Sequence, residues 1–212
     1  MRRTGWAFLT LTAMLAIACS SDGATPPVPP GTDPAGTPAA NLQFLRPVAG
    51  AALTRDSISF WAVKGQNREV AMYYKPIGSG RDSAEFLRFK VSNESLLRRP
   101  DGTAIAAGDS IRITIRILDF SKLITQFLPS GLVFSPLKPA ELRLDFGNCD
   151  QDFNHDGVVN QNDTNLVPTF AIWKQEALGQ PWVKLSSAIE VNGSLTEVKA
   201  NIEGFTNHAV AW

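Results

Sequence analysis

Side chains that carry oxygen recur at a regular spacing in the segment 152–163, called here loop 152–163. Counted from the first aspartate, they occupy positions 1, 3, 5, 9 and 12, and a glycine stands at position 6. Ca²⁺ takes roughly six to eight oxygen ligands, and a short loop supplies them when alternate side chains turn inward around a sharp backbone bend. Gly157 permits that bend because it has no Cβ. The spacing predicts a Ca²⁺ site whose ligands are Asp152, Asn154, Asp156, the backbone carbonyl of Val158, Asn160 and Asp163.

This loop resembles EF-hand calcium loops, and its ending, Asp-Gly-x-Val-Asn-x-x-Asp, resembles the loops of dockerins. The resemblance implies that Asn160 acts directly or through water, and that Val159, at position 8, packs inward. Dockerins carry two such loops, each followed by a helix. This chain has a single loop, and Pro168 soon ends any helix after it, so cohesin binding does not follow. The alternative is an acidic, solvated turn that binds no metal.

The N-terminus carries the features of a secretory signal peptide. Arg2 and Arg3 precede the apolar stretch 6–17, which is too short for a comfortable transmembrane helix. The following Ala16-Ile-Ala-Cys19 resembles the lipobox of bacterial lipoproteins. That resemblance implies cleavage after residue 18, diacylglycerol and N-acyl chains such as palmitate on Cys19, and a lipid anchor in the cell envelope, with Ser20 favouring the outer membrane. An ordinary cleaved signal with a chance cysteine is the alternative.

Composition divides the rest of the chain into a linker and one domain. Residues 19–40 are rich in proline, serine, threonine, glycine and alanine, so they cannot bury enough apolar surface to fold. We expect them to form a disordered, extended spacer between the lipid and a domain spanning residues 41–212. That length is enough for a single domain with its own core.

Charge and motif content exclude several classes of function. Removal of the signal peptide leaves 18 basic against 20 acidic residues, without a basic patch, so nucleic acid is not an expected partner. After lipidation only Cys149 remains, which we expect to be a small buried residue. The sequence contains none of the common hydrolase or phosphate-binding motifs, so we expect no enzymatic activity.

The hydrophobic pattern indicates β-structure almost throughout. Residues 111–117 alternate isoleucine with arginine or threonine, which is typical of a half-buried strand. Similar short runs occupy residues 57–63, 69–75, 85–91, 132–134, 141–146, 169–174, 182–185, 197–202 and 208–212. Asn192-Gly193 predicts a tight hairpin, and 120–127 has room for one short helical turn. We therefore predict an all-β antiparallel β-sandwich, with the calcium loop inserted between strands 141–146 and 169–174.

The C-terminal third resembles the β-sandwich module shared by ankyrins, netrin receptors and many bacterial surface proteins. The resemblance rests, in order, on residues 129–134, 139–144, 171–173, Trp182 with Leu185, and 204–212. It implies a domain without enzymatic activity that supports protein–protein contacts or packs against neighbouring domains.

Two functional hypotheses follow. The first is a lipid-anchored, calcium-binding envelope protein with a non-enzymatic binding or scaffolding role and a protein partner. The second is an accessory protein of polysaccharide binding or degradation, with a glycan partner. Trp61, Trp173, Trp182 and Trp212 could stack on sugars, although core packing is the simpler role. His155 is expected to be exposed, and His208 to close a hydrogen bond at the sandwich edge.

Overall fold

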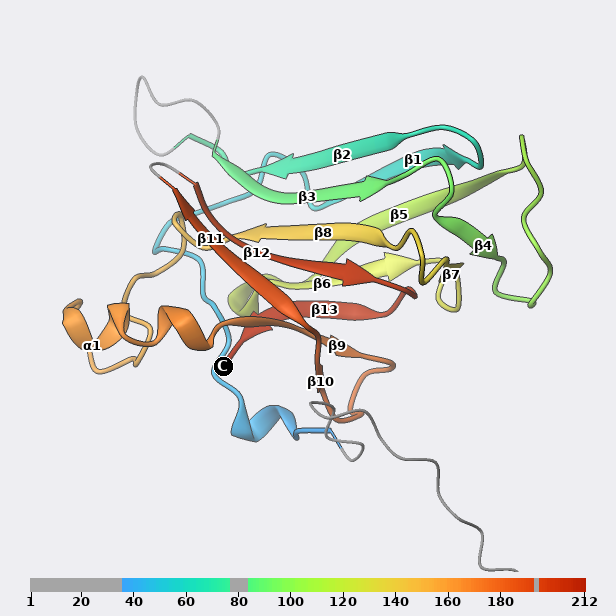
Figure 1. Cartoon of the computed structure of the whole chain (residues 1–212). Helices are drawn as coiled ribbons and strands as arrows, with labels where there is room; N and C mark the ends of the chain where they lie inside the picture. Colours follow the sequence, from blue (N-terminus) through green and yellow to red (C-terminus); the bar gives the residue numbers. More distant parts are fainter. Residues whose placement is uncertain (1–35, 77–83, 193–194) are drawn as a thin grey trace, which may run out of the picture. The chain divides into compact units, whose positions relative to one another are not determined.

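The structure is a computed structural model that describes residues 36–76, 84–192 and 195–212. The predicted signal peptide, Cys19 and most of the predicted linker lie outside the described residues. The described chain folds into antiparallel sheets with one short α-helix, which confirms the predicted all-β class (Figure 1).

Two large sheets make up the sandwich (Figure 1). The first has the spatial order β1 (Ser57–Val63), β5 (Ser110–Asp119), β6 (Ile124–Leu128), β13 (Asn207–Ala211), β9 (Ala171–Gln175) and β10 (Val183–Lys184). The second has the order β11 (Ser187–Asn192), β12 (Leu195–Ile202), β8 (Ala140–Asp145), β3 (Glu85–Val91) and β2 (Arg68–Tyr73). A small separate pair joins β4 (Leu96–Arg98) to β7 (Val133–Phe134).

Alternation of side chains fixes which face of each strand meets the core. In β5, Ile111, Ile113 and Ile115 are buried, whereas Arg112 and Arg116 are exposed, as the sequence pattern predicted. A shift of one residue in register would move all three isoleucines into water, so the pattern specifies the pairing of β5 with β1 and β6.

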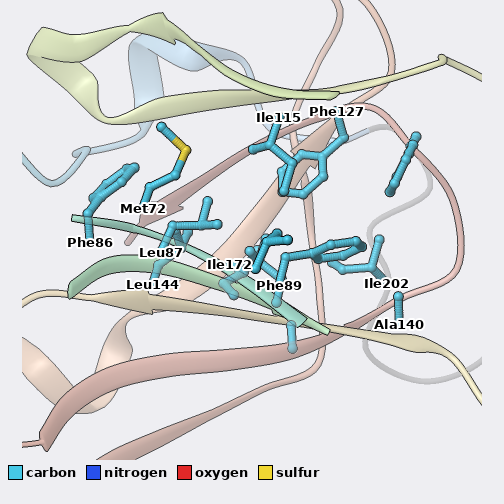
Figure 2. Close-up of a cluster of buried hydrophobic side chains, with 14 of the residues drawn as sticks. Met72, Phe86, Leu87, Phe89, Ile115, Phe127, Ala140, Leu144, Ile172 and Ile202 are labelled. Atoms are coloured by element: carbon cyan, nitrogen blue, oxygen red, sulfur yellow. The ribbon is translucent and has the colours of Figure 1, made fainter. Parts of the chain in front are cut away.

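Aromatic and aliphatic side chains fill the space between the sheets. Figure 2 shows Phe89 of β3 and Phe127 of β6 in this cluster, and their ring centroids lie 5.2 Å apart in an edge-on arrangement. Neither ring is accessible to solvent. Full burial of a phenylalanine contributes roughly 1.5–3 kcal/mol, and an aromatic pair about 0.5–1.5 kcal/mol more. Contacts of this kind hold the two sheets together.

The segment 120–127 contains the one short helical turn that the sequence has room for, and then continues as a strand. Only Phe120–Lys122 forms a short 3₁₀ turn (η2), and Ile124 already begins β6. The Asp119 side chain accepts a hydrogen bond from the Ser121 amide at 2.9 Å and so starts the turn. After it, Thr125 and Phe127 alternate into the core, and this period of two is incompatible with a helix.

The chain joins the domain before residue 41. Thr37, which falls within the predicted linker, exchanges two backbone hydrogen bonds with Trp182, at 2.7 and 2.8 Å. Gly36 packs so closely that a Cβ added there would lie 2.8 Å from the Cβ of Pro181. A 3₁₀ turn follows at Ala39–Asn41 (η1). This part of the predicted linker therefore lies against the domain.

The predicted hairpin strands pair as expected. β11 and β12 are antiparallel, with Asn192 opposite Leu195, so only residues 193–194 connect them. Those two residues lie outside the described part of the chain.

Candidate metal-binding loop

Loop 152–163 lies in the connection that crosses from one sheet to the other. β8 ends at Asp145 in the five-stranded sheet, and β9 begins at Ala171 in the six-stranded sheet. The connection holds the short helix α1 (Gln161–Thr164) and a 3₁₀ turn, η3 (Val167–Thr169), both visible beside the label α1 in Figure 1. The predicted position of the loop between these two strands is therefore confirmed.

The first half of the loop closes around its own side chains. The Asp152 carboxylate accepts hydrogen bonds from the backbone amides of Asp156, at 3.1 Å, and Gly157, at 2.8 Å. The Asn154 side-chain oxygen accepts from the Asp156 amide at 2.9 Å. His155 and Gly157 both take left-handed backbone conformations, with φ of 58° and 87°. This double reversal turns the side chains at positions 1 and 3 inward, and Gly157 adopts it without strain.

The second half of the loop is organised by Asp163. Its carboxylate is buried and accepts from the backbone amides of Asn154, at 3.0 Å, and Asn160, at 2.9 Å. These hydrogen bonds hold the pKa of the Asp163 carboxyl below its usual value, because they favour the ionised form. The Asn160 side chain in turn accepts from the Asn162 amide at 2.7 Å and caps α1. Asp163 thus links position 3 of the loop to position 9.

The remaining candidate ligands contact each other across the turn. The Asp156 carboxylate accepts from the Val158 amide at 2.9 Å and from the Asn154 side-chain amide at 2.8 Å. The Val158 carbonyl accepts from the Asn160 side-chain amide at 3.0 Å. All six predicted residues are therefore joined in one hydrogen-bonded network within twelve residues of chain.

The donor chemistry of this network suits a hard cation. Its candidate ligands are all oxygens, which Ca²⁺ prefers and which are poor ligands for softer metals. A carboxylate has about four lone-pair sites, so Asp152, Asp156 and Asp163 keep acceptor capacity beyond the hydrogen bonds just described. In the part of the chain that the structure describes, however, no three His, Cys, Asp or Glu side chains form a group that could hold a metal ion. An ion here would need the asparagine and backbone oxygens as well, and would displace the amide contacts of Asn154 and Asn160.

An aromatic cluster attaches the loop to the domain. Phe153, at position 2, is buried, and its ring centroid lies 4.9 Å from that of Phe170, nearly perpendicular to it. Trp212, the residue after β13, lies 6.0 Å from Phe153 and 4.6 Å from Phe170. Val159 does not take part: its side chain is 64% exposed, so the expectation that position 8 packs inward is wrong. The loop is anchored through position 2 instead.

The loop also contacts the segment that enters the domain from its N-terminal side. The Asp150 amide donates to the Arg46 carbonyl at 2.9 Å, and Cys149 forms a β-bridge with Pro47. His155 lies 3.2 Å from the Gln43 side-chain oxygen and is half-buried rather than exposed. Partial burial, and then the charge of Arg46, lower the pKa of His155. The start of the domain and the loop therefore share one surface.

Cys149 and His208 are both buried, but only the cysteine was predicted so. Burial raises the pKa of the Cys149 thiol to about 12, so the thiolate is scarce at neutral pH. His208 does not close a hydrogen bond at the sandwich edge, because neither of its ring nitrogens has a partner among the described residues. Its ring instead packs edge-on against Phe127, with centroids 5.1 Å apart. The sequence pattern gave no sign of this, since His208 occupies an ordinary strand position.

The tryptophans of the domain do not form a sugar-stacking platform. Trp182 is buried, and Trp173 and Trp212 are half-buried against the domain. Trp61 alone among these four is exposed, at 60%, on the outer face of β1.

No helix within the described residues has the length and apolar character needed to span a bilayer. Comparison of the chain with protein-family models, with curated proteins and with solved structures yields no match.

Proposed function

We propose that this protein is a lipid-anchored, calcium-binding β-sandwich of the cell envelope, with a binding or scaffolding role and no catalytic one. The observation that carries the proposal is the hydrogen-bonded network of loop 152–163, in which the side chains at positions 1, 3, 5, 9 and 12 all bond within the loop. The apolar N-terminal stretch and Cys19 support the envelope location.

Calcium would act on the loop by relieving charge repulsion. Asp152, Asp156 and Asp163 bring three carboxylates into one short turn, and the hydrogen bonds that they accept do not cancel the repulsion between them. A divalent cation among them replaces this mutual repulsion with attraction of each carboxylate to a shared positive charge. Ion binding is therefore expected to stabilise the closed loop, and with it the crossover between the two sheets.

The contacts of the loop suggest what this stabilisation serves. Phe153 of the loop packs on Trp212. Just before the loop, Cys149 and Asp150 pair with residues 46–47. Residues 43–45 pair in turn with the end of β13. Calcium bound at the loop would thus tighten the place where the domain joins its predicted tether.

A second candidate function is capture of a polysaccharide at the outer face of β1 and β5. The observation that favours it is Trp61, which is exposed and stands opposite Arg112 in the β1–β5 ladder. An exposed ring beside a guanidinium offers both a stacking surface and hydrogen-bond donors. A pull-down against insoluble glycans, with Trp61→Ala as the control, tests this candidate separately from calcium.

The calcium proposal is tested by thermal unfolding of the mature chain carrying Cys19→Ser, which removes the acyl chains. A ligand that binds only the native state adds RT ln(1 + [L]/Kd), about 2.7 kcal/mol at a hundredfold excess over Kd. We expect Ca²⁺ to raise the melting temperature, and Mg²⁺ to raise it less because it demands a tighter octahedral shell.

Two isosteric variants provide the control. Asp156→Asn removes a charge inside the loop and should diminish the Ca²⁺ response, while Asp150→Asn removes a charge just outside it and should not. Identical melting with and without millimolar Ca²⁺ would mean that the loop is an acidic turn.

A further inference from the structure

His208 presents two buried ring nitrogens that find no hydrogen-bond partner in the described part of the chain. Its side chain is inaccessible to solvent, and neither Nδ1 nor Nε2 has a partner among the described residues. Buried polar atoms in native proteins are nearly always satisfied by protein, ordered water or a ligand. A histidine left in this state therefore calls for a partner beyond the described residues, such as an ordered water or a ligand.

A cavity of about 350 Å³ adjoins this histidine. It lies where the ends of β12 and β9 meet the start of β13, and where the chain leaves β10. Its polar lining consists of Lys174, Ser186, Asn201, Glu203 and His208, and its apolar wall includes Leu185. Its size is at the lower end of the range for small-molecule sites, about 300–1,000 Å³.

The sheet register directs two of these side chains to the same face. His208 of β13 stands directly opposite Lys174 of β9, so both side chains project from one face of the six-stranded sheet. Ile172, two residues before Lys174, is fully buried in the core between the sheets, so that face is the inner one. Both residues line the cavity, where His208 is fully buried and the Lys174 side chain is partly exposed.

The charges around the cavity balance. Lys174 is the only basic residue of the lining and Glu203 the only acidic one, and the Lys174 ammonium also pairs with Glu176 at 2.8 Å. Burial, reinforced by the charge of Lys174, keeps the imidazole neutral, so it offers one donor and one acceptor. The lining as a whole therefore mixes donors and acceptors without net charge, next to an apolar wall.

We propose that this cavity binds a small, uncharged, polyhydroxylated ligand of monosaccharide size, with His208 hydrogen-bonded to one of its hydroxyl groups. Hydroxyls are both donors and acceptors, which matches Ser186, Asn201 and the neutral imidazole. The C–H face of a sugar ring packs against Leu185. The site is separate from loop 152–163 and does not depend on calcium.

The test is an NMR titration of the Cys19→Ser chain, observing the His208 ring and the amides of Ser186 and Asn201. The probes are D-glucose, D-galactose, D-mannose and N-acetylglucosamine, with glucuronate and inorganic phosphate as anionic comparisons. We expect at least one neutral sugar to produce saturable shifts at all three residues. His208→Phe, which keeps a ring against Phe127, should raise the dissociation constant for that sugar by about tenfold or more.

Further variants guard against a folding defect in His208→Phe. Ser186→Ala and Asn201→Ala alter exposed residues of the lining, and each should weaken binding of the same sugar. Asn41→Ala alters an exposed asparagine outside the lining and should leave that binding unchanged. The proposal is overturned if no neutral sugar gives saturable shifts, if the shifts fall elsewhere, or if phosphate or glucuronate binds more tightly than every neutral sugar.

Discussion

Replacement of Phe153 by alanine removes the ring that joins loop 152–163 to the domain. The side chain is buried against Phe170 and Trp212, with ring centroids 4.9 and 6.0 Å away. Truncation of a buried phenylalanine costs about 3–5 kcal/mol, as lost transfer free energy plus the cavity left behind. The site lies at the end of the sandwich and can partly collapse, so we expect about 3 kcal/mol. In a domain of this size, that loss lowers the melting temperature by roughly 6–12 °C.

The assay is urea unfolding followed by tryptophan fluorescence and circular dichroism, with the midpoint and slope fitted together. Val159→Ala is the matched control, because it truncates an apolar side chain of the same loop that is 64% exposed. It should change stability by no more than about 0.5 kcal/mol. If Phe153→Ala were as mild as Val159→Ala, the loop would not be packed on the core, and the link between calcium and the domain would fail with it.

Three other predictions concern separate parts of the molecule. Burial, and then the charge of Lys174, lower the pKa of His208 from its ordinary 6.5 to about 3. Between these two pKa values the unfolded chain binds a proton at His208 and the native state does not. The free energy of unfolding should therefore fall as pH drops from about 6.5 toward 3, by up to about 1.4 kcal/mol per pH unit. Urea midpoints across this range should fall less steeply in His208→Phe, and equal slopes would refute the burial. Gly147→Ala should cost about 1–3 kcal/mol, because a Cβ there overlaps the Thr196 hydroxyl. Adding Thr196→Ala should recover part of that loss, and no recovery would locate the strain elsewhere. Cys19→Ser should release the protein from the membrane fraction or block its processing, and an unmodified mature N-terminus in the wild type would exclude the anchor.

The strands could be predicted wherever one face of a sheet meets the core. In β5 the alternation of isoleucine with arginine is clean, because the strand is buried on one side only. In β13 every residue from Asn207 to Ala211 is buried, so burial does not alternate along the strand. The sequence therefore does not indicate which face of the sheet His208 occupies. The single helical turn expected within residues 120–127 is the capped 3₁₀ turn Phe120–Lys122, and the alternation of Thr125 and Phe127 that follows it belongs to β6.

The loop could be located from the sequence because its ligand spacing is local. Twelve consecutive residues carry the whole pattern, so no tertiary information is needed to find it. The anchor of the loop could not be predicted in this way. Phe153 meets Phe170 and Trp212, which lie 17 and 59 positions further along the chain, and only the folded sheets bring them together. For the same reason, the sequence did not reveal the contact between Thr37 and Trp182.

Calorimetric titration of Ca²⁺ into the Cys19→Ser chain tests the central claim most directly. We expect one Ca²⁺ per chain, a weaker response to Mg²⁺, and weaker Ca²⁺ binding in Asp156→Asn but not in Asp150→Asn. Absence of heat at millimolar Ca²⁺, or binding that survives Asp156→Asn unchanged, would contradict it.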